Sequence, residues 1–172
     1  MNREIYPKVK LIINHAMKEA KSFDDVKVRP EHIILSILVD DDNESVKALK
    51  LLNVDTTELY DKLSDALRKT DLTPRLTNSV RKNLPFSDET KAIFKALDKE
   101  CEKLNDNMID TFHIMLAVLL SKSVTTDLLN EMGINYNSFK KQINIMKESN
   151  KSAYDSDEPS DEETYKRKSK QT

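Results

Sequence analysis

The sequence predicts an all-α protein, in which two pseudo-symmetric four-helix repeats pack into one globular domain and a disordered acidic tail follows. Three observations lead to this prediction. A short apolar stretch occurs twice, the segments around it repeat the same helical spacing of apolar residues, and the 172 residues include a single glycine. Repeated helical units bury their apolar faces against each other, and a chain poor in glycine but rich in Leu, Lys, Ile and Glu favours helices.

The duplicated stretch reads PEHIILSILV over residues 30–39 and TFHIMLAVLL over residues 111–120. When His32 is aligned with His113, apolar residues of one stretch fall on apolar residues of the other. Both stretches are apolar almost all round, which is typical of a buried helix rather than a surface helix. We therefore expect one central buried helix in each repeat.

Four helices are predicted in the first repeat, which runs from about residue 5 to 69. Their expected ranges are 7–21, 30–40, 44–52 and a fourth from about residue 56. Pro7 and Pro30 open the first two, because proline suits the first turn of a helix. The acidic residues Asp40, Asp41, Asp42 and Glu44 favour the start of the third helix, whose first turn exposes free amides and a partial positive charge. The pair Asp55–Thr56 can cap the fourth.

The second repeat, from about residue 86 to 147, follows an irregular crossover over residues 70–85. The apolar spacing in that crossover is compatible with a short helix over residues 74–82. Ser87 is a favourable N-cap for the first helix of the repeat. Gly133 lies just past a predicted helix, where a left-handed end favours glycine. Beyond the second buried helix the alignment shifts by one position, because Leu49 then falls on Leu129. One loop of the second repeat is therefore shorter.

The repeat domain is expected to span residues 1–148, and residues 149–172 are expected to form a flexible charged linker or tail. Residues 152–163 contain six acids, and a basic block follows at residues 166–170. Such a segment cannot bury enough apolar area to offset the entropy of ordering it.

Composition narrows the classes of function. The formal net charge of -2 argues against a general nucleic-acid binder. A single glycine cannot build the glycine-rich loops that hold nucleotide phosphates, and no spacing typical of metal ligands or paired catalytic groups occurs. We therefore predict no catalytic residue, no cofactor and no metal site. A small helical enzyme would need a cleft with paired ionisable groups, and a helical DNA-binding protein would need a basic recognition helix.

The chain also lacks the marks of a membrane or secreted protein. No stretch approaches the roughly 18–20 consecutive apolar residues of a membrane span, and the first residues lack the apolar core of a secretion signal. One cysteine, Cys101, permits no intramolecular disulfide and fits an apolar helical pattern as a small core residue. We expect a cytoplasmic protein that binds neither membrane nor nucleic acid.

The two histidines of the duplicated stretch are predicted to be structural. His32 and His113 lie near the starts of the two buried helices, and His15 is the only other histidine. A metal or general-base role would require Cys, His or acidic partners at suitable spacing. A buried imidazole that bonds to a neighbouring loop backbone would instead fix the start of each helix.

The doubled pattern, with its x-Glu-His-Ile-x-Leu core, resembles the Clp N-terminal repeat domain, which stands at the front of hexameric Clp-family AAA+ unfoldases of the ClpC/ClpA kind. The similarity covers about residues 5–147. The matching segments are residues 30–38 and 51–55 in the first repeat, and residues 84–87, 110–114 and 129–134 in the second.

This resemblance implies a binding domain without catalysis of its own. Family members capture protein substrates and adaptor proteins and pass them to an ATP-driven ring, often coupled to a Clp peptidase. ATP would bind downstream modules that are absent from this chain. We expect the front domain of such an unfoldase, with a stand-alone Clp-type adaptor or regulator as the alternative.

Some relatives of the ClpC kind bind phosphoarginine on their substrates. There the acid of the Glu-His motif holds the guanidinium, and helix-start amides help to hold the phosphate. Glu31 matches that acid in the first repeat, whereas the second repeat has Phe112. Pro7 lacks the helix-start N–H that Ser87 retains. Glu31 and Ser87 are therefore the candidate partner-binding residues. The alternative role for Glu31 is to complement the partial positive charge at the N-terminus of its own helix.

Overall fold

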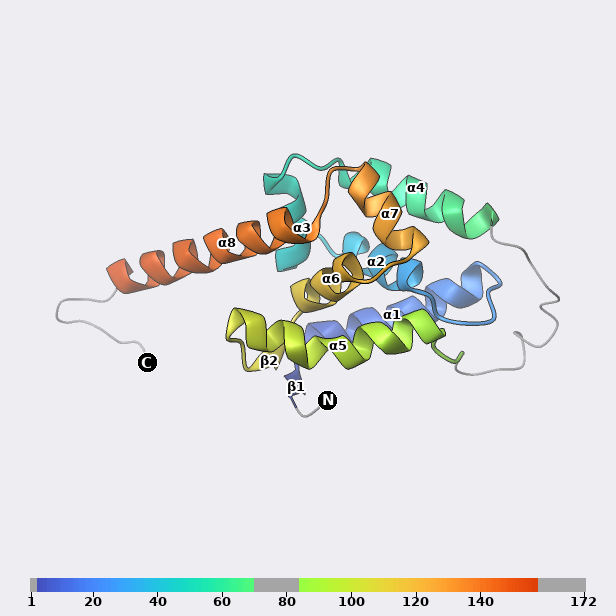
Figure 1. The fold of residues 1–172 in the computed structure, drawn as a ribbon, viewed down its shortest axis with the longest axis horizontal. Coiled ribbons are helices and arrows are strands. Elements are labelled where there is room, and N and C mark those ends of the chain that lie inside the picture. Colours follow the sequence, from blue (N-terminus) through green and yellow to red (C-terminus); the bar gives the residue numbers. More distant parts are fainter. Residues whose placement is uncertain (1–2, 70–83, 158–172) are drawn as a thin grey trace.

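The structure, a computed structural model, describes residues 3–69 and 84–157 (Figure 1). Within these ranges the chain forms eight helices and two very short strands. The elements are β1 (Glu4–Ile5), α1 (Pro7–Ser22), α2 (Pro30–Val39), α3 (Glu44–Leu51), α4 (Thr56–Lys69), α5 (Asp88–Leu104), β2 (Met108–Ile109), α6 (Thr111–Leu120), α7 (Val124–Glu131) and α8 (Tyr136–Asp157). The predicted all-α fold with two four-helix repeats is confirmed.

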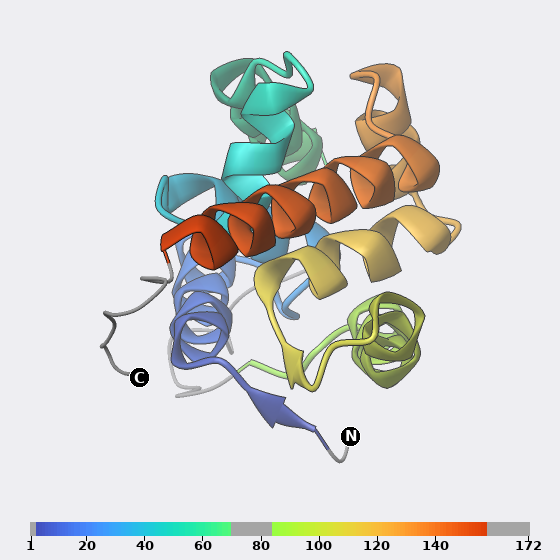
Figure 2. The ribbon, with the colours of Figure 1, turned by 90° about the vertical axis from the view of Figure 1, so that its left-hand side faces the viewer.

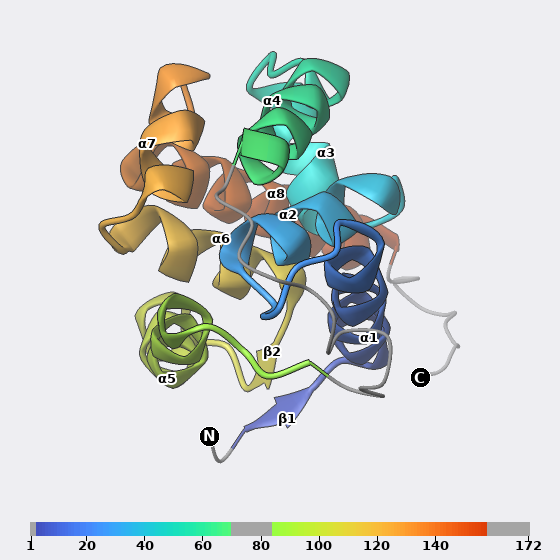
Figure 3. The same cartoon turned by 90° about the vertical axis from the view of Figure 1, so that its right-hand side faces the viewer.

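The helices α2 and α6 form the centre of the core and lie next to each other (Figure 3). Every residue from His32 to Leu38 is buried, as is every residue from Thr111 to Leu119. α2 packs mainly against α1 and α4, whereas α6 packs mainly against α5 and α8. α8 lies across both α3 and α6, so it joins the two repeats (Figure 2).

Left-handed residues end equivalent helices in the two repeats. Asp24 and Asn105 follow α1 and α5 with φ of 56° and 60°, and Asn53 and Gly133 follow α3 and α7 with φ of 64° and 85°. The residues of each pair occupy equivalent positions in the alignment of the two repeats. The helix end predicted at Gly133 is confirmed, and the duplication extends to the backbone of the loops.

Two parallel pairings connect the repeats, and the sequence analysis predicted neither. Ile5 of β1 pairs with Ile109 of β2, and Val28 forms an isolated parallel bridge with Phe86. The alignment of His32 with His113 also places Ile5 on Phe86 and Val28 on Ile109, so the same contact is made twice. The segment before the first helix of each repeat pairs with the segment before the buried helix of the other repeat.

The last helix extends beyond the domain boundary predicted at residue 148, because α8 continues to Asp157. The sequence contains no glycine or proline between Gly133 and Pro159, so no residue there interrupts a helix. The rest of the predicted tail, residues 158–172, lies outside the described residues, as does the crossover segment with its predicted helix over residues 74–82.

Among the helices that the structure describes, none is both long enough and apolar enough to cross a membrane by itself. α6 and α7 reach that length and composition only as a pair, and a bend of 101° separates them.

Candidate functional site

Helix starts from both repeats meet in two equivalent places. We call junction one the place where the starts of α2, α5 and α7 meet, and junction two the place where the starts of α6, α1 and α3 meet. The reciprocal backbone pairings create this arrangement, because each brings the first helix of one repeat to the buried helix of the other. Each junction therefore contains residues from both repeats.

Junction one contains Glu31, the second residue of α2. Its carboxylate accepts a hydrogen bond from the side chain of Thr125, at the start of α7. Burial raises the pKa of Glu31, and the nearby charge of Glu89 raises it further. The backbone amide of Glu31 itself, the side chain of Thr125 and the charge of Arg29 lower it, but not enough to cancel the rise. The folded protein thus holds a half-buried carboxylate whose pKa stays raised despite these partners.

Arg29, the N-cap of α2, is held by an acid of its own repeat. Its Nε atom donates to Oδ2 of Asp25 at 2.8 Å. Burial alone would raise the pKa of Asp25, but the hydrogen bond and the charge of Arg29 lower it overall. The guanidinium therefore serves the loop before α2 and is not a free cation of junction one.

Ser87 acts as the N-cap of α5. Its hydroxyl accepts a hydrogen bond from the amide of Thr90 at 3.1 Å, and its own amide donates to the carbonyl of Val28 at 3.0 Å. The side chain is only slightly exposed, so both polar groups serve the fold. The N–H that the sequence analysis offered to a phosphate is therefore already used within the chain.

The structure brings the starts of α2 and α5 together, and with them the candidate residues Glu31 and Ser87. It does not bring Pro7 to Glu31. Pro7 instead lies at junction two, because the repeats cross over. Pro7 and Glu31 therefore lie at different junctions, although both belong to the first repeat.

Junction two opens into two neighbouring hollows. The first has a volume of about 220 Å³ and is lined by Tyr6, Pro7, Lys8, Asp42, Asn43, Glu44 and Asp110. The second has a volume of about 150 Å³ and is lined by Glu44, Phe112, Ile143, Met146, Lys147 and Asn150. Glu44 lines both, so the two hollows are adjacent at that side chain. No local pattern in the sequence predicts this site, because its residues are spread over both repeats.

The two histidines make the same helix-start contact. Nδ1 of His32 accepts a hydrogen bond from the amide of Arg29 at 2.8 Å, and Nδ1 of His113 accepts one from the amide of Asp110 at 2.8 Å. Burial lowers the pKa of His32 to about 4 and also lowers the pKa of His113. This geometry suits the structural role predicted for the pair.

Within residues 3–69 and 84–157, no group of three or more His, Cys, Asp or Glu side chains could hold a metal ion. Cys101 is buried, and burial raises the pKa of its thiol to about 11. A thiol in that state is a poor nucleophile.

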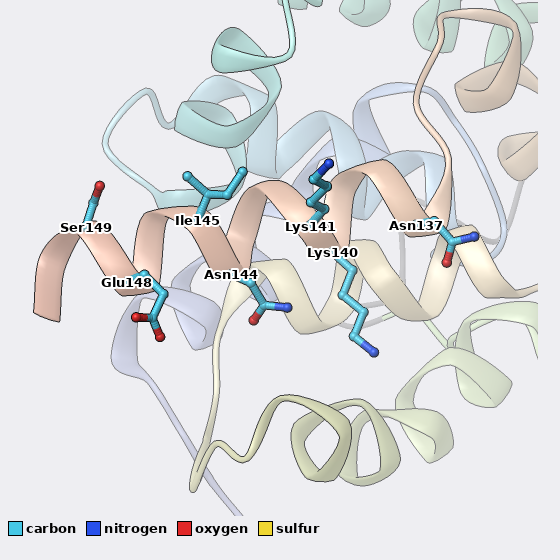
Figure 4. Close-up of a pocket in the computed structure, with 7 residues that line it drawn as sticks. All are labelled: Asn137, Lys140, Lys141, Asn144, Ile145, Glu148 and Ser149. Atoms are coloured by element: carbon cyan, nitrogen blue, oxygen red, sulfur yellow. The ribbon is translucent and has the colours of Figure 1, made fainter.

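A third hollow, of about 740 Å³, runs along the outside of α8 (Figure 4). Its lining residues are Asn137, Lys140, Lys141, Asn144, Ile145, Glu148 and Ser149. All seven come from one helix, so this region is an open face rather than an enclosed site. It includes Ile145, whose side chain is 49% exposed.

Comparison with known sequences matches residues 5–132 to the family of the Clp repeat (R) N-terminal domain. The chaperone protein ClpB of Vibrio vulnificus strain YJ016 is 27% identical over 127 residues, which are 74% of this chain and 14% of that protein. ClpB of Corynebacterium glutamicum is 25% identical over 125 residues, which are 73% of this chain and 14% of that protein. The chain thus spans only a small part of the curated relatives that it matches.

Solved structures share the fold. A chain from a malarial protein secretion system has a TM-score of 0.70 at 21% identity, over 83% of this chain and 94% of that one. The Hsp104 N-terminal domain of Candida albicans has a TM-score of 0.67 at 18% identity, over 81% of this chain and 89% of that one. A ClpV N-domain in complex with a VipB peptide has a TM-score of 0.62 at 18% identity, over 80% of this chain and 83% of that one.

Proposed function

The chain belongs to the Clp repeat N-terminal domain family, and we propose that it is the substrate- and adaptor-binding domain of a Clp-family ATP-dependent unfoldase. In this proposal the domain captures proteins and delivers them for unfolding, and for degradation where a Clp peptidase is coupled to the hexamer. ATP hydrolysis would belong to other parts of such a protein, of which this chain spans a small share.

The observation that carries the proposal is the environment of Glu31 at junction one. A carboxylate whose pKa is raised by burial destabilises the folded state at neutral pH, so a glutamine there would be less costly. The acid is half-buried but still reaches the surface. A partner group that donates hydrogen bonds or carries positive charge would relieve this state on binding. Related folds also support binding, since the ClpV N-domain was solved with a peptide.

Phosphoarginine would be a more specific ligand for the same domain, but the residues of junction one disfavour it. Glu31 would suit the guanidinium, but the phosphate would approach the first turn of α5. That turn carries Asp88 and Glu89, and the amide of Ser87 is already bonded to Val28. Negative charge and a used donor both disfavour an anion. We therefore propose unmodified protein segments as the ligands of junction one.

A binding assay with unfolded protein tests the function. Fluorescently labelled, permanently unfolded casein is titrated with the full chain, and anisotropy is measured. We expect saturable binding that Glu31→Gln weakens about fivefold to tenfold, as the loss of about 1–1.4 kcal/mol would. Glu58→Gln is the matched control, because that carboxylate lies on α4 with its side chain 55% exposed.

Two results would count against the proposal. Absence of binding to casein and to an array of varied peptides would remove the protein-binding function. Equal binding by the Glu31→Gln and wild-type chains would leave Glu31 with a role at the helix start only.

A further inference from the structure

We propose that junction two is a peptide-docking groove for a partner segment in which a lysine or arginine is followed by an aliphatic residue. The inference rests on the protein-binding function proposed above, and it assigns a different surface and a defined ligand chemistry. The two adjacent hollows, both lined by Glu44, make up this groove.

One end of the groove is apolar. Phe112 of α6 and Ile143 and Met146 of α8 line it, and the hollow there is about 150 Å³. Pockets for small molecules usually measure about 300–1,000 Å³. A hollow of this size therefore suits one aliphatic side chain of a larger partner.

The other end is acidic. Its lining includes the carboxylates of Asp42, Glu44 and Asp110. Asp110 forms no ion pair within the part of the chain that the structure describes, and its carboxylate accepts a hydrogen bond from the amide of Thr111 at 2.7 Å. Burial raises the pKa of Asp110 and the charge of Glu44 adds to this, and the pKa stays raised although the amide of Thr111 and the charges of His113 and Lys8 lower it. A cation placed between these two carboxylates would offset both effects.

The two lysines of the groove are already engaged. Lys8 donates to the carbonyl of Asp42 and lies 3.7 Å from the carboxylate of Asp40. Lys147 donates to the carbonyl of Leu104 at 3.2 Å and pairs with Asp106 at 2.5 Å. Glu44 pairs with Lys47 at 3.3 Å, and the charge of Lys8 acts on Asp110 from a distance. No lysine among the described residues forms an ion pair with Asp110, so that carboxylate stays available to the cation of a ligand.

An anion is the wrong ligand here, although three helices begin at the groove. α1 begins with Pro7, which has no N–H. The amide of Val46 in α3 donates to Asn43 at 3.0 Å, and the amide of Thr111 in α6 donates to Asp110. Helix starts bind anions through free first-turn amides, and these side chains have taken several of them.

The duplication shows that the two junctions differ in chemistry. In the alignment of the repeats, Arg29 of junction one corresponds to Asp110 of junction two, and Glu31 corresponds to Phe112. Junction one thus has a cation and an acid at the two positions where junction two has an acid and an aromatic ring. Equivalent backbones therefore present different ligand preferences, and junction two combines negative charge with an apolar surface.

A titration monitored by nuclear magnetic resonance tests the groove with the full chain. The probe is a short peptide with one arginine followed by leucine in a background of alanine and serine. We expect shifts of backbone amides clustered at Glu44, Asp110 and Phe112. A peptide with citrulline in place of arginine, or alanine in place of leucine, should bind about tenfold more weakly, since each loses roughly 1.4 kcal/mol.

Variants of the chain supply the matched controls. Glu44→Gln combined with Asp110→Asn removes both charges and keeps a good N-cap, because asparagine caps helices as well as aspartate. This double variant should lose about tenfold in affinity and much of the salt dependence. Glu58→Gln, at an exposed carboxylate outside both junctions, should bind the peptide as the wild type does.

Three results would overturn the inference. The first is equal affinity for the arginine and citrulline peptides, and the second is a set of shifts centred away from junction two. The third concerns the chain's own basic block: if neutralising Lys166, Arg167, Lys168 and Lys170 to glutamine raised the peptide affinity tenfold, that block and not a partner would be the occupant. Casein binding that depends on Glu31 but without any peptide effect at junction two would reject this groove and leave the proposed function intact.

Discussion

Nε2 of His113 lies 2.8 Å from Oδ2 of Asp106, while Nδ1 of the same ring accepts a hydrogen bond from a backbone amide. At the equivalent position His32 accepts the same amide bond, but its Nε2 is 3.6 Å from Asp25. A backbone amide can only donate, so Nδ1 is unprotonated in both rings and the proton of the neutral imidazole is on Nε2. Protonation of Nδ1 would break the bond that starts each central helix.

Acidification is therefore expected to destabilise the domain. Burial lowers the pKa of His32 from 6.5 to about 4, and it lowers that of His113 as well. At pH values between the lowered pKa of the folded protein and the ordinary pKa of the unfolded chain, the unfolded chain binds more protons than the folded chain. The free energy of unfolding therefore falls as the pH falls. Each histidine adds a slope of up to about 1.4 kcal/mol per pH unit. Urea unfolding between about pH 5 and pH 7 measures this slope.

The matched variant for this test is His113→Asn, whose side-chain oxygen can still accept the amide bond. It should show a smaller slope than the wild type over the same pH range. A slope that is unchanged by the substitution would show that His113 does not titrate as its burial implies.

Leu35→Ala and Leu116→Ala are expected to destabilise the domain by about 2–5 kcal/mol each, because each removes a fully buried side chain and leaves a cavity. Leu11→Ala is the control, since Leu11 on α1 is 69% exposed and should change stability by less than about 0.5 kcal/mol. Chemical denaturation measures all three. Losses below about 1 kcal/mol at Leu35 or Leu116 would contradict the central position of α2 or α6.

Gly133→Ala is expected to cost about 1 kcal/mol through the backbone alone. Its φ is 85°, and an added Cβ would meet no atom within 4 Å, so no clash contributes. Asn53, at the equivalent turn, has φ of 64°. Asn53→Gly should be neutral or slightly stabilising, whereas Asn53→Ala should cost about as much as Gly133→Ala. Equal stability of all three variants would argue that these turns relax on substitution.

Tyr136→Phe tests the contact between α5 and α8. The hydroxyl of Tyr136 donates to Oε1 of Glu100 at 2.6 Å, and Glu100 is 1% exposed. Removing the hydroxyl leaves a buried carboxylate with one donor fewer, and Lys103 at 3.1 Å remains. We expect a loss of about 1.5–3 kcal/mol in thermal or urea unfolding. Tyr6→Phe, at a 42% exposed tyrosine, is the control and should have little effect.

The helices could be predicted closely because their signals are local. Apolar residues at helical spacing, Pro7 and Pro30 at first turns, Ser87 as an N-cap and Gly133 as a left-handed end each report on a few neighbouring residues. The structure confirms these starts and ends to within one or two residues. Residues 149–157, which were expected to belong to a flexible tail, instead continue α8 to Asp157, because no helix-breaking residue occurs before Pro159.

The candidate site could be predicted only in part. Glu31 was found through the Glu-His motif, and Ser87 through its cap position, yet nothing in the sequence showed that they belong to one junction. Phe112 was noted only as a missing acid, whereas the structure places it in a groove with Ile143 and Met146. Those three residues lie on helices whose mutual position no local pattern records.

Duplication, the buried central helices and the family resemblance were all accessible from the order of amino acids, because each depends on spacing along the chain. Packing alone determined which helix starts meet. The pairings of Ile5 with Ile109 and of Val28 with Phe86 are too short to leave a periodic pattern, and they join residues far apart in the chain. By crossing the repeats over, these contacts set Asp110 beside the starts of α1 and α3, and so created an acidic and apolar groove that neither repeat contains by itself.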